Sequence, residues 1–588
     1  MRSSILKSAI LALLFLSLNQ ANAGNGPLFP TGIVWSPDGH LIMTEKGQDR
    51  ISLYSSDGKA LKATYELDAP PTGVAVAEGK LFITTFGSEG ELHIMDMADG
   101  KEYARIETGS GACSPITDLE RGKVYVCNRF SNTVSEVDVS TAEVTRTARS
   151  MREPVSAAVT KDGKYLYVTN FLPAQRADAD YVAAYVSIID LKTFRRIKDI
   201  RLANGSNAVR NICMSPDGKY AYVCHNLGRY TVPTSQLHQG WMNTSSLTII
   251  DTRKQEIFGT IVTDEPEQGA AGIWDVECDE KNIYISHSGT HEISVIRQDE
   301  MIRRLIEATD RSAIEYNLTF LKGIRRRIDV EGNGPRAICL SDEKLYVPTY
   351  FADILNVYDI KTGSMSAIDL NPGRTETDIN KGERLFNDAS NCFQGWQSCN
   401  GCHPGDGRAD GMNWDLMNDG IGNPKNCKSL LFSHVTPPSM ISGIRSSAEW
   451  AVRAGFKFIQ FFNISEKDAA CVDAYLKSLE PVPSPYLVNG ELSEKAKKGK
   501  EIYHELKCDD CHGGSYYTDL QMYRIGEDIE FDQGWDTPTL RESWRTAPYL
   551  FDGRAATMQE VFEVHRHGID KKISKKEIEE LTEYVNSL

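Results

Sequence analysis

Seven copies of one strand pattern occupy the first three fifths of the chain. Each copy has a strand, a tight turn such as Asp-Gly, an aromatic-rich strand such as "KYLYVTN" (164–170), a loop, and a strand that ends in Asp. Neighbouring copies start about 40 to 63 residues apart, and a propeller blade of four short strands needs about 40. The copies begin at Gly32, Gly73, Ser114, Pro154, Val209, Gly272 and Pro335.

Seven such units can close into a ring, which hides the sheet edges that separate units would expose. We therefore predict a seven-bladed β-propeller over residues 24–370. "KYLYVTN" resembles the signature of the YVTN family of seven-bladed propellers. An open β-solenoid is the alternative, but it fits less well because the strands group in fours. Propellers host many functions, so this fold alone indicates no activity.

Three insertions lengthen the later blades. The first, residues 225–244, is rich in aromatic residues and carries His238 and Trp241, and the loop 286–292 brings in His287 and His291. These loops either line the central channel, touch the following domain, or simply cap their blades. A basic amphipathic insertion at 300–329 is expected to pack on the propeller or on the next domain.

The N-terminus has the pattern of a secretory signal peptide. Arg2 and Lys7 precede the apolar run 9–18, and residues 21–23 supply small residues for cleavage. We predict that residues 1–23 are removed and that the protein is exported to the periplasm or cell envelope. An uncleaved anchor is the alternative, but the apolar run is shorter than the ~20 residues of a membrane-spanning helix.

The charge of the chain argues against nucleic acid as a partner, and its hydropathy argues against a membrane-spanning protein. The formal net charge is −16 and no basic cluster occurs, which argues against nucleic acid as a partner. No later segment is long and apolar enough to span a bilayer, so we expect a soluble, exported protein. The oligomeric state cannot be inferred from these features.

Two CxxCH segments predict covalent haem attachment. In this pattern two thiols at i and i+3 lie on one helical turn and reach one porphyrin, and the next residue ligates the iron. Cys399, Cys402 and His403 would hold one haem. Cys508, Cys511 and His512 would hold the other. A four-cysteine zinc site is the alternative, but it leaves the histidine after each pair unexplained.

The composition changes near Asn371, where strand alternation gives way to helical spacing. We predict two mainly α cytochrome c-like haem domains, 371–482 and 483–588, joined by "PVPSPY" (481–486). The expected fold class is therefore a multidomain chain, an all-β seven-bladed propeller followed by two haem domains. Two covalently bound haem c groups are the expected cofactors.

The chain has 13 cysteines, and nine lie outside the CxxCH segments. Six of these nine lie in or beside apolar strand runs of the predicted propeller, where buried free thiols are expected. Cys392, Cys427 and Cys471 flank the haem region, and one pair among them could be bridged.

The C-terminal part resembles the bacterial di-haem cytochrome c peroxidase and MauG family. The resemblance covers residues 374–588 and is most specific in "WDTPTLRESWRTAPYLFDGRAATMQEV" (535–561). It implies one haem that stores an electron at high potential and one that meets peroxide or another oxidant. It also implies a tryptophan between the haems, for which Trp450 stands at the matching place, with Arg453 beside it. A calcium ion between the haem lobes is implied as well, although no ligand set stands out.

The sixth iron ligands remain open. For the second haem, His565 shares a helical face with Met558, Val561 and Phe562, and His567 precedes Gly568 as in other propeller-linked members. Either would give bis-histidine ligation. For the first haem, His434 is the candidate ligand or acid–base group, with Met412, Met417 and Met440 as rivals. Cys427 stands where relatives with peroxidase activity carry a histidine.

Three functions follow from these features. The first is a periplasmic di-haem oxidoreductase of the peroxidase/MauG type, in which His434, Trp450 and Arg453 would be catalytic. The second is a pure electron-transfer cytochrome, and the third is a propeller binding module with attached relay haems. A small redox protein or a quinol-linked donor is the expected electron partner.

Overall fold

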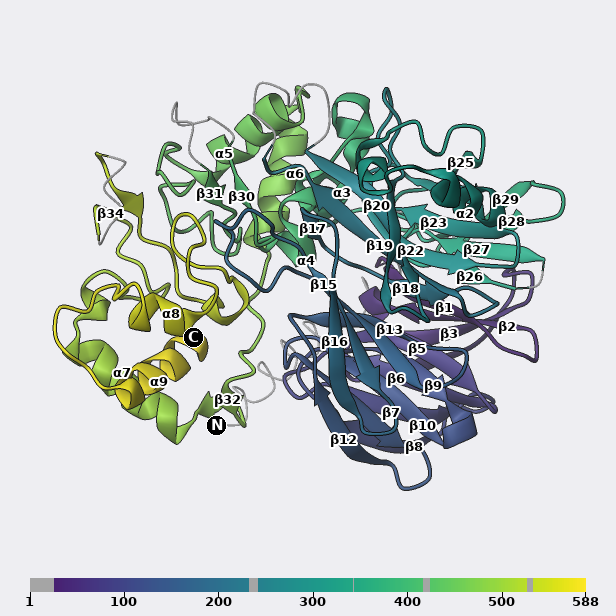
Figure 1. Ribbon diagram of the computed structural model, residues 1–588, viewed down its shortest axis with the longest axis horizontal. Coiled ribbons are helices and arrows are strands. Elements are labelled where there is room, and N and C mark those ends of the chain that lie inside the picture. The colour runs from purple at the N-terminus through teal and green to yellow at the C-terminus, as the bar shows by residue number, and fades with distance from the viewer. Residues whose placement is uncertain (1–25, 232–241, 342, 416–423, 526–531) are drawn as a thin grey trace, which may run out of the picture.

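A computed structural model describes residues 26–231, 242–341, 343–415, 424–525 and 532–588 (Figure 1). The predicted signal peptide and two residues of the first insertion, His238 and Trp241, lie outside these ranges, as does Met417. Among the described residues, no helix is both long and apolar enough to cross a membrane. The chain forms a β-propeller followed by two smaller helix-containing units.

The propeller has seven blades, each an antiparallel sheet. The first four blades comprise β1 (Pro30–Trp35), β2 (His40–Glu45), β3 (Arg50–Ser55) and β4 (Leu61–Glu66); β5 (Pro71–Ala77), β6 (Lys80–Thr85), β7 (Glu91–Asp96) and β8 (Glu102–Glu107); β9 (Ala112–Asp118), β10 (Lys123–Asn128), β11 (Thr133–Asp138) and β12 (Glu143–Arg149); and β13 (Pro154–Val159), β14 (Tyr165–Asn170), β15 (Tyr185–Asp190) and β16 (Arg195–Arg201).

The fifth blade has one strand more than the others, because β18 pairs with β19 beside β17. The last three blades comprise β17 (Ser206–Asn207), β18 (Ile212–Met214), β19 (Tyr220–Gly228), β20 (Asn243–Asp251) and β21 (Glu256–Val262); β22 (Ile273–Cys278), β23 (Asn282–His287), β24 (Glu292–Arg297) and β25 (Arg325–Asp329); and β26 (Cys339–Leu340), β27 (Lys344–Pro348), β28 (Ile354–Asp359) and β29 (Met365–Asp369).

The blades close into a ring. The innermost strands contact one another in the order β1, β5, β9, β13, β18, β22 and β26, and β26 returns to β1. At the closure, the Leu28 amide donates to Asp353 Oδ2 at 3.0 Å and Tyr346 Oη donates to the Ser56 carbonyl at 2.8 Å. The prediction of a seven-bladed propeller is confirmed, and the open solenoid is excluded.

The repeat pattern forms blades for local reasons. Apolar residues alternate along each strand and pack between neighbouring sheets, as with Tyr125, Val134 and Leu166 in the interface of the third and fourth blades. The Asp-Gly turns place Gly39 and Gly163 at φ of +87° and +65°, which glycine adopts without strain. The basic insertion forms α2 (Gln298–Glu307), which packs on the propeller as predicted.

The first C-terminal unit follows the last propeller strand. It contains α3 (Asp378–Asn387), a tight turn α4 (Pro404–Gly407), the short pair β30 (Asn413–Trp414) and β31 (Lys425–Asn426), α5 (Ala448–Ala454) continued by one π-helical turn (Gly455–Ile459), and α6 (Glu466–Lys477). The second unit contains β32 (Leu487–Val488), β33 (Glu491–Leu492), α7 (Glu494–Glu505), β34 (Met522–Tyr523), β35 (Trp535–Asp536), α8 (Met558–Glu563) and α9 (Lys575–Asn586).

The two units repeat one helix crossing. A Cβ added to Gly382 of α3 would lie 1.9 Å from the Cys471 carbonyl oxygen of α6, and one added to Gly499 of α7 would lie 1.9 Å from the Glu580 oxygen of α9. Only glycine permits so close an approach of two helices. Helices nevertheless make up a minority of residues 371–588, because long loops surround the CxxCH segments. The units are therefore less helical than predicted.

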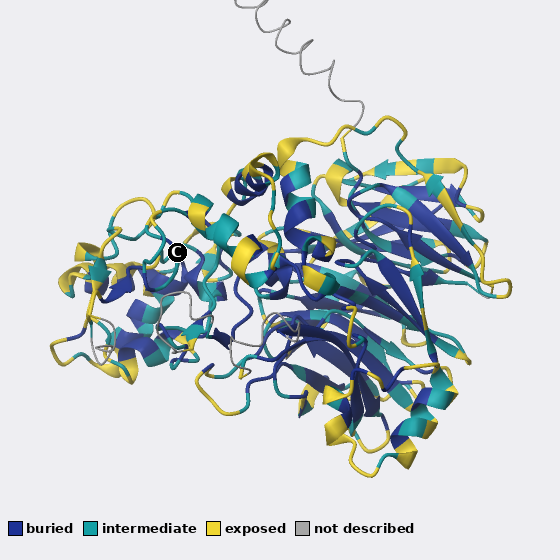
Figure 2. Ribbon diagram, turned by 90° about the horizontal axis from the view of Figure 1, so that it is seen from above, coloured by how far each residue is buried: buried dark blue, intermediate teal, exposed yellow. Residues whose placement is uncertain are grey.

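The first unit lies against one end of the propeller. Backbone bonds join Gly269 to the Gln394 carbonyl (2.8 Å) and Ala389 to the Gly289 carbonyl (2.9 Å), and His291 Nε2 lies 3.0 Å from Asp388 Oδ1. In Figure 2, buried segments continue from the blades into this contact. The loop 286–292 thus touches the C-terminal part, one of the three roles considered for it.

Candidate cofactor sites

Each CxxCH segment forms one tight helical turn. Cys399 and Cys508 begin short 3-10 turns, and the amides of His403 and His512 donate to the carbonyls of Cys399 and Cys508 at 2.9 and 2.8 Å. The turn brings both thiols and the histidine of each segment to one cavity. The two segments therefore have the same local geometry.

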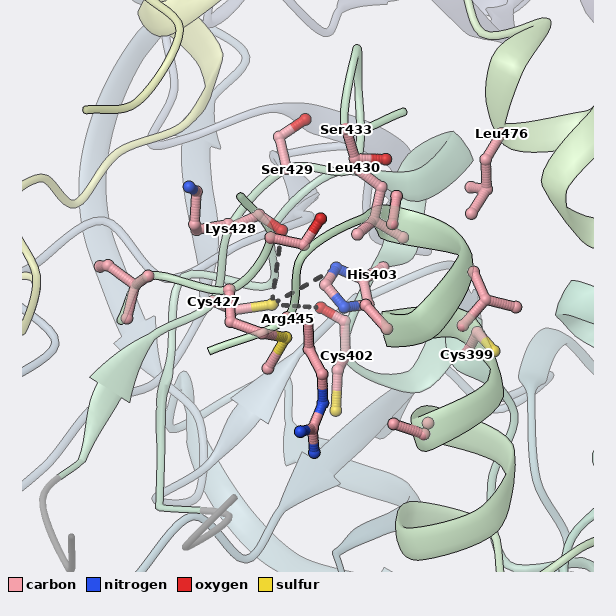
Figure 3. A pocket seen from close by; sticks show the side chains of 18 of the residues that line it. Cys399, Cys402, His403, Cys427, Lys428, Ser429, Leu430, Ser433, Arg445 and Leu476 are labelled. Carbon is pink, nitrogen blue, oxygen red and sulfur yellow. Dashed lines mark hydrogen bonds between the residues drawn. The ribbon is translucent and has the colours of Figure 1, made fainter. Parts of the chain in front are cut away.

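The first segment lines a cavity of about 290 Å³, which we call the first cavity. Ligand sites in proteins commonly occupy about 300–1,000 Å³. Its walls are mostly apolar and come from the loop 425–445, from α5 with the π-helical turn, and from α6, through residues such as Leu430, Val452, Phe458 and Leu476. Cys399, Cys402 and His403 also line it (Figure 3).

His403 is suited to ligate a metal. Burial lowers its pKa to about 4, which keeps the imidazole neutral at physiological pH. Its Nδ1 lies 3.5 Å from Cys427 Sγ, and Cys427 Sγ also donates to the Cys402 carbonyl at 3.2 Å (Figure 3). Cys427, the residue at the position of the relatives' histidine, is therefore a direct neighbour of His403.

The propeller supplies part of the first cavity. The hairpin β19–β20 carries Met242, which lines the cavity, and Asn243, whose Nδ2 donates to Cys402 Sγ at 3.3 Å. Gln460 of the unit itself donates to Cys399 Sγ at 3.2 Å. Both attachment thiols thus have an amide donor, one from each part of the chain.

The second segment lines a cavity of about 320 Å³, the second cavity. His512 and His567 both line it, and their ring centroids are 6.3 Å apart. A transition metal lies about 2.0–2.1 Å from an imidazole nitrogen, so two rings on opposite sides of one iron have centroids about 6 Å apart. The spacing fits an iron between these two histidines.

The structure separates the two candidate ligands of the second iron. His567 lines the second cavity, whereas His565 does not. Helix α8 ends at Glu563, and Arg566 adopts a positive φ of +48°, so the chain turns and directs His567 inward. Burial, followed by the nearby His512, lowers the pKa of His567 to about 4. The sequence slightly favours His565 over His567, whereas the structure places His567 on the cavity.

The two cavities share a wall. Lys428 of the first unit lies there beside Asp536 of the second, with Nζ 2.6 Å from Oδ2. Burial raises the pKa of Asp536, and the charge of Lys428 opposes that rise. The residues that line both cavities are Asn426, Cys427, Lys428, Ser429, Ile441, Asp536, Thr537 and Thr539. Groups bound in the two cavities would therefore be close neighbours.

His434 and Arg453 meet away from the first cavity, and neither lines it. His434 Nε2 lies 3.0 Å from Asp473 Oδ1, and Arg453 Nη1 lies 2.5 Å from Asp473 Oδ2. This buried ion cluster connects α5 with α6. The geometry differs from the expected ligand or acid–base position of His434, because its ring is turned to Asp473.

Trp450 does not lie between the cavities. Its side chain is 64% exposed, and it lines neither cavity. On the same helix Ala448, Ala451 and Val452 face the first cavity, so Trp450 points to the opposite side. Of the rivals for the first iron, Met440 lines the cavity, and Met412 does not. The first cavity has His403 as its single histidine among the described lining residues.

None of the 13 cysteines forms a disulfide bond. Cys392, Cys427 and Cys471 form no bridge, so the pairing considered for them is absent. Among the described residues, three His, Cys, Asp or Glu ligand atoms converge in one place, at Asp68, Glu91 and His93 of the second blade. That group lies outside both cavities. The calcium ion implied by the resemblance stays a prediction.

Sequence reasoning missed four residues of these sites: Asn243, Gln460, Lys428 and Asp536. The sequence gives weak evidence for Lys428 and Asp536, because Lys428 follows a short strand and Asp536 ends one. It gives none for Asn243 and Gln460, since their roles depend on how distant parts of the chain meet.

Comparison with known proteins finds relatives for parts of the chain. The chain is 26% identical over 273 residues to hydrazine synthase subunit gamma of Kuenenia stuttgartiensis, which covers 36% of this chain and 77% of that protein. It is 26% identical over 184 residues to subunit beta from the same organism, which covers 30% of this chain and only 47% of that protein.

A solved Kuenenia stuttgartiensis hydrazine synthase chain shares the fold. The TM-score is 0.52 at 19% identity, and the match covers 59% of this chain and 97% of that chain. No protein-family profile matches. The chain is therefore similar, over part of its length, to two subunits named for hydrazine synthase.

Proposed function

We propose that the chain is a di-haem c-type cytochrome that acts as a redox enzyme of the cytochrome c peroxidase/MauG type. Cys399 and Cys402 would attach one haem, and Cys508 and Cys511 the other. One observation carries the proposal: each CxxCH segment lines its own largely apolar cavity, and the two cavities share a wall. Each unit would then be a cytochrome c-like haem domain.

The two cavities would have different roles, electron transfer in one and reaction with a small molecule in the other. In the second, His512 and His567 face each other at 6.3 Å and would hold an iron from both sides, which suits electron transfer. In the first, His403 would hold an iron from one side, opposite the apolar surface of α5. Haem iron supplies one-electron redox chemistry and, at a free coordination position, a place for a small reactant.

Side chains of the protein would set the polarity and hydrogen bonding of the first site. Asn243 and Gln460 donate to the two attachment sulfurs, and His403 stays neutral because it is buried. Phe458 and Val452 present apolar side chains to the first cavity. His434 and Arg453 would act only through α5 and α6, whose relative position their ion cluster fixes.

The reactant would be small. The peroxidase resemblance points to peroxide, whereas the relatives' name, hydrazine synthase, points to a small nitrogen compound. We propose that a small nitrogen compound is the physiological reactant. Peroxide would be an artificial oxidant that reacts at the same site in a laboratory assay. We also propose that the protein is exported to the periplasm or cell envelope. A small redox protein or a quinol-linked donor would supply its electrons.

A pure electron-transfer cytochrome is the second candidate. It would need a sixth ligand in the first cavity, and the thioethers of Met242 and Met440 line that cavity. A binding role for the propeller alone fits less well, because its hairpin β19–β20 contributes directly to the first cavity.

Electron paramagnetic resonance (EPR) on the purified full-length protein tests the proposal. We expect two haems by mass, one high-spin ferric signal and one low-spin bis-histidine signal. The half-reduced protein should react with peroxide and with hydrazine, and the hydrazine reaction should change the high-spin signal. Two low-spin signals without reaction would favour the electron carrier, and a colourless protein would overturn both.

A further inference from the structure

One end of the propeller carries a ring of alternating cationic and aromatic side chains. Each comes from the start of an innermost strand or from the turn after the second strand of a blade. Because these strands are antiparallel, the two positions meet at the same end of the central channel. We call this set the channel ring: Arg129, Phe171, Arg210, Trp274, Arg336 and Tyr350.

The aromatic rings hold the guanidinium groups in place. The Arg210 guanidinium carbon lies 3.8 Å from the centroid of Trp274 and 4.7 Å from that of Phe171. The Arg336 carbon lies 4.2 Å from Trp274 and 4.0 Å from Tyr350. Stacking engages the faces of the guanidinium groups and leaves their N–H edges available to acceptors.

Those edges have no partner in the described parts of the chain. The side chains of Arg210 and Arg336 make no hydrogen bond or salt bridge there, and the Lys46 ammonium at the same end makes none either. Arg336 is only 8% exposed, and its buried Nε is unsatisfied. Burial, and then the like charges of Arg336 and Arg129, lower the pKa of Arg210. An unpaired charge buried like that of Arg336 is costly, and a ligand that neutralises it would remove that cost, whereas Arg210 is half-buried and Lys46 is exposed.

Two carboxylates from the first CxxCH unit lie near these cations, Glu383 of α3 and Asp406. Asp406 belongs to the tight turn α4, three residues after His403. Burial would raise its pKa, but the charges of Lys46, Arg408 and Arg336 outweigh this and hold the pKa below its usual range. No salt bridge to Asp406 is formed among the described residues, so the cations act on it across a gap.

The turn itself rests on the ring. A Cβ added to Gly405 would lie 3.0 Å from Nη2 of both Arg129 and Arg545. The turn that follows the first haem-binding histidine therefore covers this end of the channel. A ligand on the ring would alter the charges that Asp406 experiences, and through the turn it would be coupled to His403.

We propose that the channel ring and Lys46 bind a small oxyanion, with the N–H edges of Arg210 and Arg336 on its oxygen atoms. Guanidinium forks match the oxygen spacing of carboxylate-like and phosphate-like anions. The site is separate from both cofactor cavities, because no residue of the ring lines either one. It does not depend on the proposed redox function.

Calorimetric titration of the haem-loaded full-length protein at low ionic strength tests this site. Nitrate is the planar probe and sulfate the tetrahedral one. We expect saturable binding of at least one probe, weakened about tenfold or more by Arg210→Gln and by Arg336→Gln. Arg253→Gln, in an exposed turn of the fifth blade, is the matched control and should leave the affinity unchanged.

Asp406→Asn provides a test that misfolding cannot imitate. It removes one of the two negative charges that act on these cations, so the affinity should rise several-fold rather than fall. Absence of saturable binding to the wild-type protein would overturn the proposal, as would equal losses in Arg210→Gln and Arg253→Gln. Loss of bound haem in a folded Arg210→Gln variant would also overturn it, because the ring would then serve the cofactor.

Discussion

The two C-terminal units share a helix crossing but differ in what their cavities contain. Both pack a glycine against a carbonyl oxygen of the partner helix, and both place a CxxCH turn on a cavity of similar size. The second cavity holds two histidines whose ring centroids lie 6.3 Å apart, whereas among the described lining residues of the first cavity His403 is the one histidine.

This difference shows how one fold can serve two roles. In the second unit, the segment after α8 turns inward and supplies His567. In the first, the helix α5 continues as a π-helical turn, and Phe458 lies on the cavity instead. The first cavity is also lined by Met242 of the propeller, whereas the described lining of the second cavity comes from residues 426–585. Reactivity would then be confined to the cavity that the propeller covers.

The largest effect should follow from removing one pair of attachment cysteines. Cys399→Ala with Cys402→Ala should leave one covalent haem and abolish reaction with peroxide or hydrazine. Cys508→Ala with Cys511→Ala should also leave one haem, but retain the high-spin signal. Intact mass and EPR measure both. Retained reactivity in the first variant would break the proposed difference between the units.

The next effect concerns the sixth ligand of the second iron. His567→Ala should convert the low-spin signal to high-spin, because it removes one of two imidazoles that lie 6.3 Å apart. His565→Ala is the matched control two residues away, and its spectrum should match the wild type. The reverse pattern would assign the ligand to His565 and contradict the described geometry.

The choice between these two histidines could not be made from the helical spacing of the sequence. Positions 558, 561, 562 and 565 share one face only if the helix continues, but α8 ends at Glu563. The His567 amide instead donates to the Val561 carbonyl at 3.1 Å. No glycine or proline follows directly after Glu563, so the sequence carried no signal for this helix end.

Other elements were predictable to different degrees. The blades follow from strand alternation and turn residues, which are local, so all seven were found. Helical spacing also predicts the orientation of Trp450, since positions 448, 451 and 452 share the face opposite it. The contact of Asn243 with Cys402 joins residues 159 apart in sequence, and no local pattern encodes it.

A pH titration should sharpen the comparison further. Burial, followed by His512, lowers the pKa of His567 to about 4, from about 6.5 for an unperturbed histidine. A lowered pKa means that its stabilising contribution is complete above pH 6.5 and is lost as the pH falls towards 4. The imidazole is therefore neutral and available to an iron, and the low-spin spectrum should persist from pH 7 down to about pH 5. Conversion to a high-spin spectrum within that range would contradict this.

The smallest effect should come from the propeller's own contribution. Asn243→Ala removes the donor to Cys402 Sγ from the hairpin β19–β20, and Gln460→Ala removes the donor to Cys399 Sγ from within the unit. One such hydrogen bond contributes about 1 kcal/mol, so each change should slow the reaction at the first site roughly fivefold. The low-spin signal of the second site should not change in either variant. If Gln460→Ala has this effect and Asn243→Ala has none, the propeller only covers the first cavity, and equal effects would make it part of that reactive site.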